Sequence, residues 1–292
     1  MIAPLNAVAA LEAALLGGFD PEAGIPRSSV PVAGAGEILL MPAVAGDAVG
    51  VKLVSIAPGN PGHGLPRIQG VHVVFDPRTL RPVAVLDGAE LSAVRTAAVS
   101  ALAIRHLARE DARRMVIFGT GPQAAAHVDA VRAVRPGIAS IGVVARDPER
   151  LAAFVAGVAG ASVAGPEAVA DADVICCCTT AREPLFDGLL VRDGACVVAV
   201  GSHEPVAREV DSNLVARTTV VVEARGAALA EAGDLILAGR FDPASLVTLR
   251  ELVRGEVKPD PGRPRLFKSV GMAWEDAVVG AAVHARRAAS GS

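Results

Sequence analysis

Aromatic residues are scarce in this sequence, which has seven Phe, one Trp and no Tyr among 292 residues. This scarcity argues against a surface that stacks nucleic-acid bases. The formal net charge of −3 also lacks the basic excess by which proteins bind phosphate backbones. We therefore expect no nucleic-acid partner, and a core built mainly from Ala, Val and Leu.

Long apolar runs are absent as well, since no stretch approaches the ~20 residues that a membrane-spanning helix needs. The first residues contain no basic segment and include Glu12 within their apolar run, which argues against a signal peptide. Three of the four cysteines, Cys176, Cys177 and Cys178, are consecutive, and neighbours on a strand point to opposite faces. We expect neither a disulfide framework nor a metal site, because the six histidines show no ligand spacing either. The sequence predicts a cytoplasmic protein without a membrane partner.

The second half of the chain alternates short apolar runs with helical patterns. Uninterrupted Val, Ile and Cys runs are typical of strands buried on both faces of a parallel sheet. We expect strands at 115–119, 140–145, 161–164, 173–178, 195–200 and 219–223, and helices at 123–134 and 148–158. This order predicts a doubly wound α/β domain of Rossmann type.

The first hundred residues have a different pattern, in which strand-like runs are separated by turns rich in Pro and Gly. We expect helices at 5–16 and 90–107, and strands at 37–41, 50–57, 70–75 and 83–86. This predicts an α+β domain with an antiparallel or mixed sheet, to which a last helix at 273–289 returns. The expected domains are therefore 1–108 with 273–292, and 109–272.

The segment Gly119-Thr-Gly-Pro-Gln-Ala124 follows a predicted strand and opens a predicted helix. In a dinucleotide-binding loop the first glycine permits the tight turn and the second lets the backbone approach a pyrophosphate. Ala124 takes the position of close packing, and Pro122 suits a first helical turn. The helix N-terminus then favours a phosphate. The alternative is an ordinary tight turn between strand and helix. The candidate cofactor residues here are Gly119, Thr120, Gly121, Pro122 and Gln123.

The next predicted strand ends in Ala145-Arg146. An NAD site usually places a carboxylate at this strand end to bind the ribose 2′-hydroxyl. An arginine there suits a 2′-phosphate instead, so the residues favour NADP(H), with NAD(H) as the alternative. Asp147, one or two positions late, weakens this preference.

Two cations fall on apolar faces. Lys52 shares a strand face with Val54 and Ile56, and Arg95 lies in a helical stripe with Leu91 and Leu102. A buried cation needs an anion. Each therefore has a protein carboxylate as its partner, or the two line a pocket for an anionic ligand.

Several segments of the sequence resemble the ornithine cyclodeaminase/mu-crystallin family. They are Leu39-Leu-Met-Pro42, Val51-Lys-Leu-Val54, Asn60-Pro with Gly64-Leu-Pro66, Ser92-Ala-Val-Arg-Thr-Ala-Ala98, Gly119-Thr-Gly-Pro-Gln123, Val200-Gly-Ser202 with Arg208-Glu209, Glu231-Ala-Gly-Asp234 and Lys268-Ser-Val-Gly271 with Glu275-Asp276. The resemblance covers nearly the whole chain.

The resemblance implies chemistry at an amino or imino acid carbon with a nicotinamide cofactor. It also implies a homodimer formed through the first domain, which would bind the substrate. In this family the motif lysine and arginine, here Lys52 and Arg95, hold the substrate carboxylate, and Arg27 resembles an upstream substrate arginine.

One departure from the family concerns the reaction. Ornithine cyclodeaminases carry an aspartate where this chain has His203. A histidine can deliver a proton to an imine near neutral pH but suits an ammonium poorly. We therefore expect a reductase of cyclic imino acids of the pyrroline-2-carboxylate or piperideine-2-carboxylate type, with His203, adjacent Glu204 or water as the proton donor. Ornithine cyclodeaminase, an enzyme like alanine dehydrogenase, and an NADPH-dependent binding protein of mu-crystallin type are the alternatives.

Further cofactor contacts are expected where parallel strands end, because ligands gather at that edge of such sheets. These candidates are Thr179, Thr180, Val200, Gly201 and Ser202, with Ser269 approaching the nicotinamide.

Overall fold

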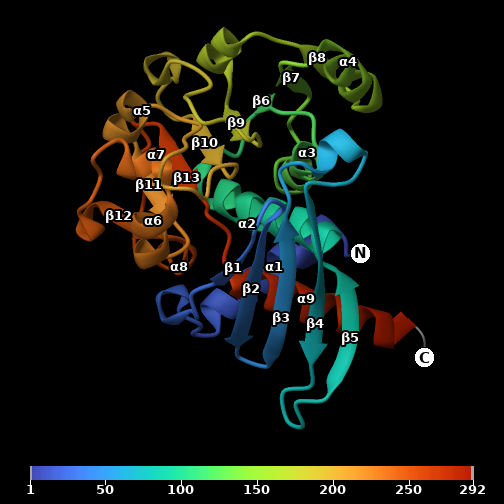
Figure 1. Cartoon of the computed structure of the whole chain (residues 1–292). Helices are drawn as coiled ribbons and strands as arrows, with labels where there is room; N and C mark the ends of the chain where they lie inside the picture. The colour runs from blue at the N-terminus through green and yellow to red at the C-terminus, as the bar shows by residue number, and fades with distance from the viewer. Residues whose placement is uncertain (1, 291–292) are drawn as a thin grey trace. The chain divides into compact units, whose positions relative to one another are not determined.

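The computed structural model describes residues 2–290 and forms two compact units (Figure 1). Unit 1 comprises the chain up to Val99 together with the segment from Met272 onward, and unit 2 comprises Ser100–Gly271. The first boundary between these units lies inside helix α2, Gly88–Leu107, whereas the domain boundary expected from the sequence follows this helix. Because one continuous helix begins in unit 1 and ends in unit 2, no change of composition marks the boundary.

Unit 1 is built on a five-stranded sheet whose strands follow one another in sequence order. The strands are β1 (Ser28–Val32), β2 (Gly36–Ala45), β3 (Ala48–Ile56), β4 (Ile68–Phe75) and β5 (Pro82–Asp87). Every neighbouring pair is antiparallel. The sequence did not predict β1, because all five of its residues are exposed and its apolar residues follow no alternating pattern of burial.

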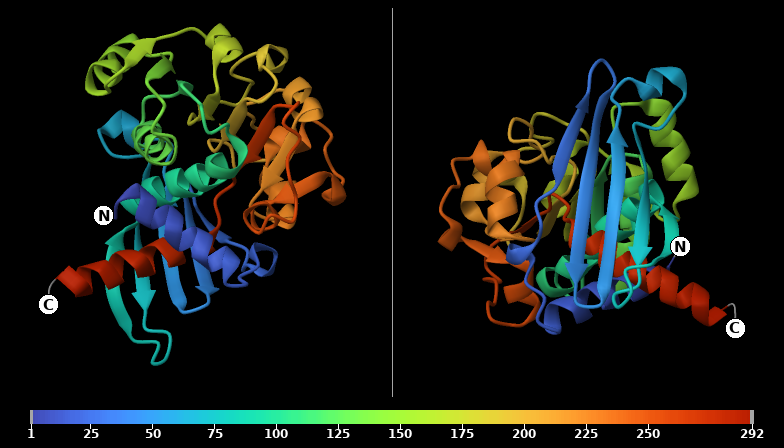
Figure 2. Two further views of the ribbon diagram at one scale, coloured as in Figure 1. Left: turned by 180° about the vertical axis from the view of Figure 1, so that it is seen from behind. Right: turned by 60° about the horizontal axis from the view of Figure 1, so that its bottom comes forward.

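One face of this sheet is covered and the other is open. Helix α9 (Ala273–Ser290) packs against β2, β3 and β4, and helix α1 (Pro4–Leu16) packs against α9. Figure 2 (right) looks onto the strands, with α9 passing behind them. In β3 the residues alternate between the two faces, so Lys52, Val54 and Ile56 are buried as their spacing predicted.

Unit 2 contains an eight-stranded sheet, with the order β12-β11-β13-β10-β9-β6-β7-β8, in which every pairing is parallel. Its strands are β6 (Arg114–Phe118), β7 (Ser140–Val144), β8 (Ala161–Val163), β9 (Val174–Cys177), β10 (Cys196–Ala199), β11 (Thr219–Val222), β12 (Leu246–Thr248) and β13 (Arg265–Lys268). The prediction of a doubly wound α/β sheet is confirmed. Two short strands were missed: β12 has three residues, and β13 has a charged residue at each end, which hides its apolar pattern.

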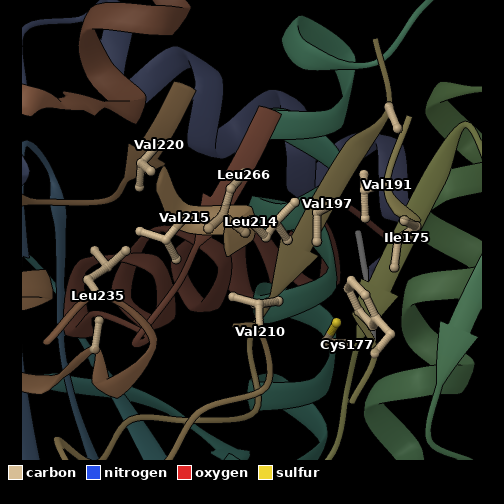
Figure 3. Close-up of a cluster of buried hydrophobic side chains, with 14 of the residues drawn as sticks. Ile175, Cys177, Val191, Val197, Val210, Leu214, Val215, Val220, Leu235 and Leu266 are labelled. Carbon is tan, nitrogen blue, oxygen red and sulfur yellow. The ribbon is translucent and has the colours of Figure 1, made fainter. Parts of the chain in front are cut away.

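Helices connect these strands, and apolar side chains fill the space between helices and sheet. The helices are α3 (Pro122–Val134), α4 (Pro148–Gly157), α5 (Ser212–Arg217), α6 (Arg225–Glu231), α7 (Gly233–Ile236) and α8 (Leu249–Val253). Val197 of β10, Val220 of β11 and Leu214 of α5 belong to one such cluster (Figure 3). Among residues 2–290, no helix is long and apolar enough to cross a membrane.

Candidate functional site

The loop predicted to bind a nucleotide joins β6 to α3 in unit 2. Gly119 has φ +107°, and a Cβ there would lie 2.5 Å from the carbonyl oxygen of Cys178, so this position requires glycine. Gly121 is extended, and a Cβ built there meets no heavy atom within 4 Å. The first glycine makes the turn and the second leaves open space directly before the α3 N-terminus. A pyrophosphate fits such a cradle, because the helix N-terminus attracts negative charge.

The end of β7 carries the charged residues on which the sequence-based preference for NADP(H) rests. Arg146 is exposed. Asp147, which weakened the sequence-based preference for NADP(H), is the N-cap of α4, and its carboxylate accepts hydrogen bonds from the backbone N–H groups of Glu149 and Arg150, both at 3.1 Å. Asp147 is therefore engaged in capping the helix.

The other predicted cofactor residues follow strands that end together. Phe118, Cys177, Ala199 and Lys268 are in register across β6, β9, β10 and β13. The residues immediately after these strands therefore lie along one edge of the sheet. They include Gly119, Thr179, Thr180, Val200, Gly201, Ser202 and Ser269.

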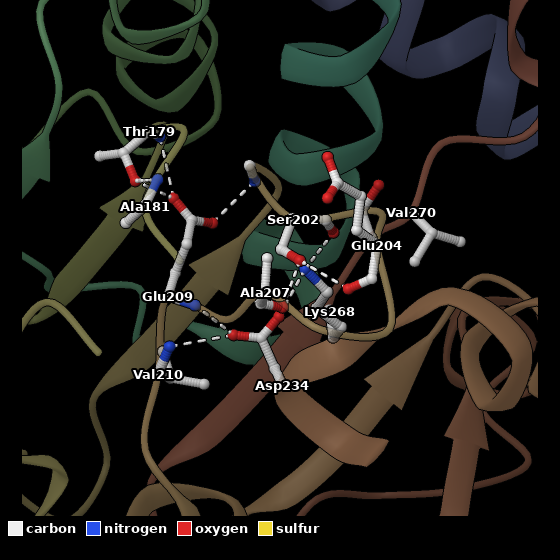
Figure 4. A network of polar contacts seen from close by, with 12 residues as sticks. Thr179, Ala181, Ser202, Glu204, Ala207, Glu209, Val210, Asp234, Lys268 and Val270 are labelled. Carbon is white, nitrogen blue, oxygen red and sulfur yellow. Dashed lines mark hydrogen bonds and ion pairs between the residues drawn. The ribbon is translucent and has the colours of Figure 1, made fainter. Parts of the chain in front are cut away.

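A buried carboxylate, Glu209, bridges two of these strand ends (Figure 4). Its Oε1 accepts hydrogen bonds from the backbone N–H of Thr179 at 2.9 Å and from the Thr179 hydroxyl at 2.7 Å. Its Oε2 accepts one from the backbone N–H of Gly201 at 2.7 Å. Burial raises the pKa of Glu209, while the charge of Lys268 and the bonds from Thr179 oppose the shift.

Asp234 and Lys268 extend this network below the strand ends (Figure 4). Asp234 Oδ1 accepts the backbone N–H groups of Glu209 and Val210 at 2.7 and 2.9 Å, and its Oδ2 lies 2.8 Å from Lys268 Nζ. All three charged side chains are fully buried. In the sequence, Glu209, Asp234 and Lys268 belong to segments that resemble the family, but the sequence alone assigned them no role.

Ser269 belongs to a second carboxylate-centred group. Its hydroxyl donates to Glu223 Oε1 at 2.6 Å, and the same carboxylate accepts the backbone N–H groups of Val270 and Gly271. Ser269 is only 1% exposed. The structure therefore shows Ser269 bonded to Glu223, and its contact with a nicotinamide stays a prediction.

The two candidate proton donors lie in the loop after β10. His203 and Glu204 are both partly exposed. Glu204 Oε2 lies 3.0 Å from Arg182 Nη1, on the exposed side of the loop. The choice of proton donor among His203, Glu204 and water stays a prediction.

In unit 1 the two predicted cations lie beside one carboxylate. Lys52 Nζ is 2.7 Å from Asp276 Oδ2 and donates to the Ser92 hydroxyl at 3.0 Å. Arg95 Nε is 3.3 Å from Asp276 Oδ1, and its Nη1 is 2.8 Å from Glu275 Oε2. Each cation therefore has a protein carboxylate as its partner, and the shared Asp276 brings the two together.

Burial and neighbouring charge set the protonation of this cluster. Burial lowers the pKa of Lys52 to about 8, although Asp276 opposes the shift. Burial alone would raise the pKa of Asp276, but the charges of Lys52 and Arg95 outweigh it and lower this pKa. Near neutral pH, Lys52 is charged and Asp276 ionised. An added anion would stabilise the ammonium form of Lys52 further.

Arg27, the third predicted substrate residue, is farther along the sheet. It is partly exposed and lies directly before β1, at the edge of the sheet, whereas Lys52 is in the central strand β3. Its role in substrate binding stays a prediction.

His72 is a buried histidine beside Lys52 that the sequence did not single out. It faces Lys52 across β3 and β4, and neither ring nitrogen has a hydrogen-bond partner among the residues that the structure describes. A Cβ at Gly50 or at Gly280 would come within 2.8 Å of the ring, so both glycines make room for it. Burial lowers the pKa of His72 to about 4.

Unit 1 is expected to lose stability as the pH falls below about 6.5. Unfolded His72 binds a proton near its ordinary pKa of 6.5, whereas the folded ring stays neutral down to about 4, so acid favours unfolding. The shift corresponds to about 3 kcal/mol between pH 6.5 and 4. Urea unfolding, followed through the fluorescence of Trp274 in the same unit, should show this loss, and His72→Gln should reduce it. The exposed His63, replaced in the same way, is the control; an equal response of both variants would contradict the assignment.

The comparisons with known proteins concern nearly the whole chain. The family model described as ornithine cyclodeaminase/mu-crystallin family matches residues 6–291. The Delta(1)-pyrroline-2-carboxylate reductase of Bacillus cereus is 36% identical over 294 residues, covering 94% of this chain and 90% of that protein. The ketimine reductase mu-crystallin of Rattus norvegicus is 36% identical over 286 residues, with the same two coverages.

Solved structures agree with these matches. The Delta(1)-pyrroline-2-carboxylate reductase of Thermococcus litoralis, in complex with NADH and L-proline, is 32% identical with a TM-score of 0.91, covering 99% of this chain and 95% of that one. An archaeal alanine dehydrogenase dimer with bound NAD is 25% identical with a TM-score of 0.90, covering 100% and 93%.

Proposed function

Because the chain belongs to the ornithine cyclodeaminase/mu-crystallin family, we propose that it is a nicotinamide-dependent reductase of small cyclic imino acids. Relatives about 36% identical bear the names of pyrroline-2-carboxylate and ketimine reductases. The observation that carries the proposal is the pair Lys52 and Arg95, two buried cations joined through Asp276. They supply an anchor for a substrate carboxylate in a chain that also has an open nucleotide cradle.

In the proposed reaction a C=N bond becomes CH–NH. The loop from Gly119 to Gln123 would hold the phosphates of a reduced nicotinamide nucleotide, which would supply the hydride for the imine carbon. Lys52 and Arg95 bind the substrate carboxylate and fix the position of the neighbouring imine carbon, each charge-assisted bond contributing about 1.5–3 kcal/mol. His203 delivers the proton to the imine nitrogen, because a histidine exchanges protons near neutral pH.

The test is cofactor consumption by the purified protein. NADPH and NADH are each supplied with pyrroline-2-carboxylate or piperideine-2-carboxylate, and nucleotide oxidation is followed. Robust oxidation with a cyclic imine supports the reductase. Release of ammonia and proline from ornithine, without imine reduction, would replace it with a cyclodeaminase. Nucleotide binding without turnover in either assay would favour a binding protein.

Within this function, NADP(H) is the proposed cofactor. Arg146 follows β7 with an exposed guanidinium, while the carboxylate of Asp147 caps α4. A planar guanidinium binds a 2′-phosphate through paired hydrogen bonds.

Replacing Arg146 with alanine is expected to raise the KM for NADPH by about 10- to 100-fold, since a charge-assisted contact contributes about 1.5–3 kcal/mol. The KM for NADH should change less than twofold. Arg150→Ala is the matched control, because Arg150 is also exposed and lies 3.5 Å from Asp147. Parallel changes for both nucleotides would show that Arg146 does not bind the 2′-phosphate.

We also propose that two copies form a homodimer through the open face of the unit 1 sheet. Exposed or partly exposed apolar side chains continue across this face from strand to strand. They include Ile38, Leu40, Val44, Leu53, Val71, Val73 and Val85. Monomeric proteins rarely expose apolar patches of this kind.

Light scattering after gel filtration should give twice the chain mass. Leu53 and Val71 pair on the open face, so the double variant Leu53→Glu/Val71→Glu should elute as a monomer, because paired charges cannot be buried there. Val163→Glu in β8, at an even more exposed apolar position of unit 2, is the control. A dimer that survives the double substitution would place the interface elsewhere.

A further inference from the structure

The loop that carries His203 is attached to a buried charge. Lys268 Nζ donates to the carbonyl oxygen of Ser202 at 2.7 Å, and this carbonyl belongs to the peptide bond that leads into His203. The other partner of the ammonium is Asp234, at 2.8 Å. A buried ammonium is costly to desolvate unless it is well paired. Here the buried ammonium of Lys268 holds the main chain next to the imidazole of His203.

The side chain of Ser202 connects the beginning of the same loop to its end. The Ser202 hydroxyl lies within hydrogen-bond distance of the carbonyl oxygens of Ala207 and Glu204, on the far side of His203. Gly233 of α7 packs against these same two carbonyls, where a Cβ would come within 2.1 and 2.5 Å of them. The main chain on both sides of His203 is therefore hydrogen-bonded, before it by Lys268 and after it by the Ser202 hydroxyl.

The beginning of the loop is held by Glu209. Its carboxylate binds the N–H of Gly201 and both donors of Thr179, and Asp234 binds the N–H of Glu209 itself. A Cβ at Gly201 would lie 2.0 Å from the carbonyl oxygen of Thr179. The Glu209 carboxylate thus connects the end of β9 to the end of β10, where the loop that carries His203 begins.

From this geometry we infer that Ser202, Glu209, Asp234 and Lys268 are positioning residues for His203. The inference rests on the proposed function, in which His203 delivers the proton to the imine nitrogen. Apolar residues of the same size would fill this part of unit 2 without the cost of burying three charges. What the charged set supplies is hydrogen bonding to the main chain on both sides of His203, and proton transfer depends on such fixed geometry.

The test is a double-mutant cycle with Ser202→Ala and His203→Gln, measured as kcat at saturating nucleotide and imine. Ser202→Ala removes one hydroxyl and leaves the charged network intact. We expect it to lower kcat by about 10-fold in the natural chain and by less than twofold in the His203→Gln background. An equal loss in both backgrounds would overturn the inference, because Ser202 would then act independently of His203.

A second readout does not depend on turnover. The ring signals of the six histidines can be followed by NMR against pH, with His203 assigned by its loss in His203→Gln. Ser202→Ala should move or broaden the titration of His203. Thr218→Ala should not, although Thr218 is a buried hydroxyl of unit 2 that also donates to a main-chain carbonyl, that of Val215.

The two readouts separate the possible failures. If the protein reduces no imine but the His203 signal responds to Ser202→Ala, the proposed function fails and the positioning stands. If imines are reduced, the kcat losses are equal in both backgrounds and the His203 signal is unchanged, the positioning fails and the function stands.

Discussion

Replacing Lys52 with methionine should lower kcat/KM for a cyclic imino acid by at least about a thousandfold, while nucleotide binding stays unchanged. Lys52 contributes a charge-assisted hydrogen bond to the substrate, about 1.5–3 kcal/mol. Its loss also leaves Asp276, which is 2.7 Å from the ammonium and fully buried, without that partner. Breaking a buried pair costs about 3–5 kcal/mol, and Arg95 then remains as the main partner of Asp276. Both effects weaken the carboxylate anchor.

The loss of the Asp276 partner calls for a control that also removes the charge of Asp276. Lys52→Met/Asp276→Asn keeps the side-chain volumes and eliminates the carboxylate that lost its lysine partner, so it should regain stability without regaining activity. Imine reduction is measured by nucleotide oxidation, nucleotide binding by the fluorescence of NADPH, and folding by Trp274 fluorescence. A variant that keeps kcat/KM within tenfold would show that Lys52 does not bind the substrate. Loss of nucleotide affinity together with activity would also exclude the proposed role.

Replacing Gly121 with valine should weaken nucleotide binding by at least about a hundredfold, or about 2.7 kcal/mol, with little effect on folding. Gly121 has φ −86° and ψ −177°, a conformation that any residue adopts before a proline. No heavy atom lies within 4 Å of the Cβ position. The added side chain therefore occupies only the open space before the α3 N-terminus, where we expect the pyrophosphate.

Gly119→Ala is the informative comparison. Its φ of +107° and the carbonyl of Cys178, 2.5 Å from a new Cβ, require the backbone to move. We expect this variant to unfold at a lower temperature as well as to bind nucleotide weakly. Nucleotide titrations and thermal unfolding of both variants distinguish the two roles. If Gly121→Val binds nucleotide normally, the cofactor does not approach this loop.

The parts of this molecule that the sequence predicted well are those encoded by neighbouring residues. The strand, turn and helix around Gly119 and Gly121 follow one another directly, and the alternation in β3 placed Lys52 on the buried face. The parallel sheet was also predicted from neighbouring residues, because its longer strands are uninterrupted apolar runs. Local order along the chain is enough to recognise these features.

The partners of the buried charges could not be predicted in this way. Arg95 and Glu275 are 180 residues apart in the sequence, and nothing near Arg95 shows whether a protein carboxylate or a ligand neutralises it. Asp147 shows the same limit at short range. Its position suggested a ribose contact, whereas the hydrogen bonds to Glu149 and Arg150 show it capping a helix. Three-dimensional pairing, more than residue type, decided these roles.

The return of the chain to unit 1 at Met272 also affects how the protein is made. Lys52 and Arg95 are synthesised early, but the carboxylates that neutralise them, Glu275 and Asp276, lie near the C-terminus. At about 5–20 residues per second, a ribosome needs on the order of ten seconds to make unit 2 in between. During that time the nascent sheet has two cations to bury and no α9 to cover it. Unit 2 is continuous, whereas unit 1 can complete its core only after α9 has been made, so chaperones would meet its open sheet first.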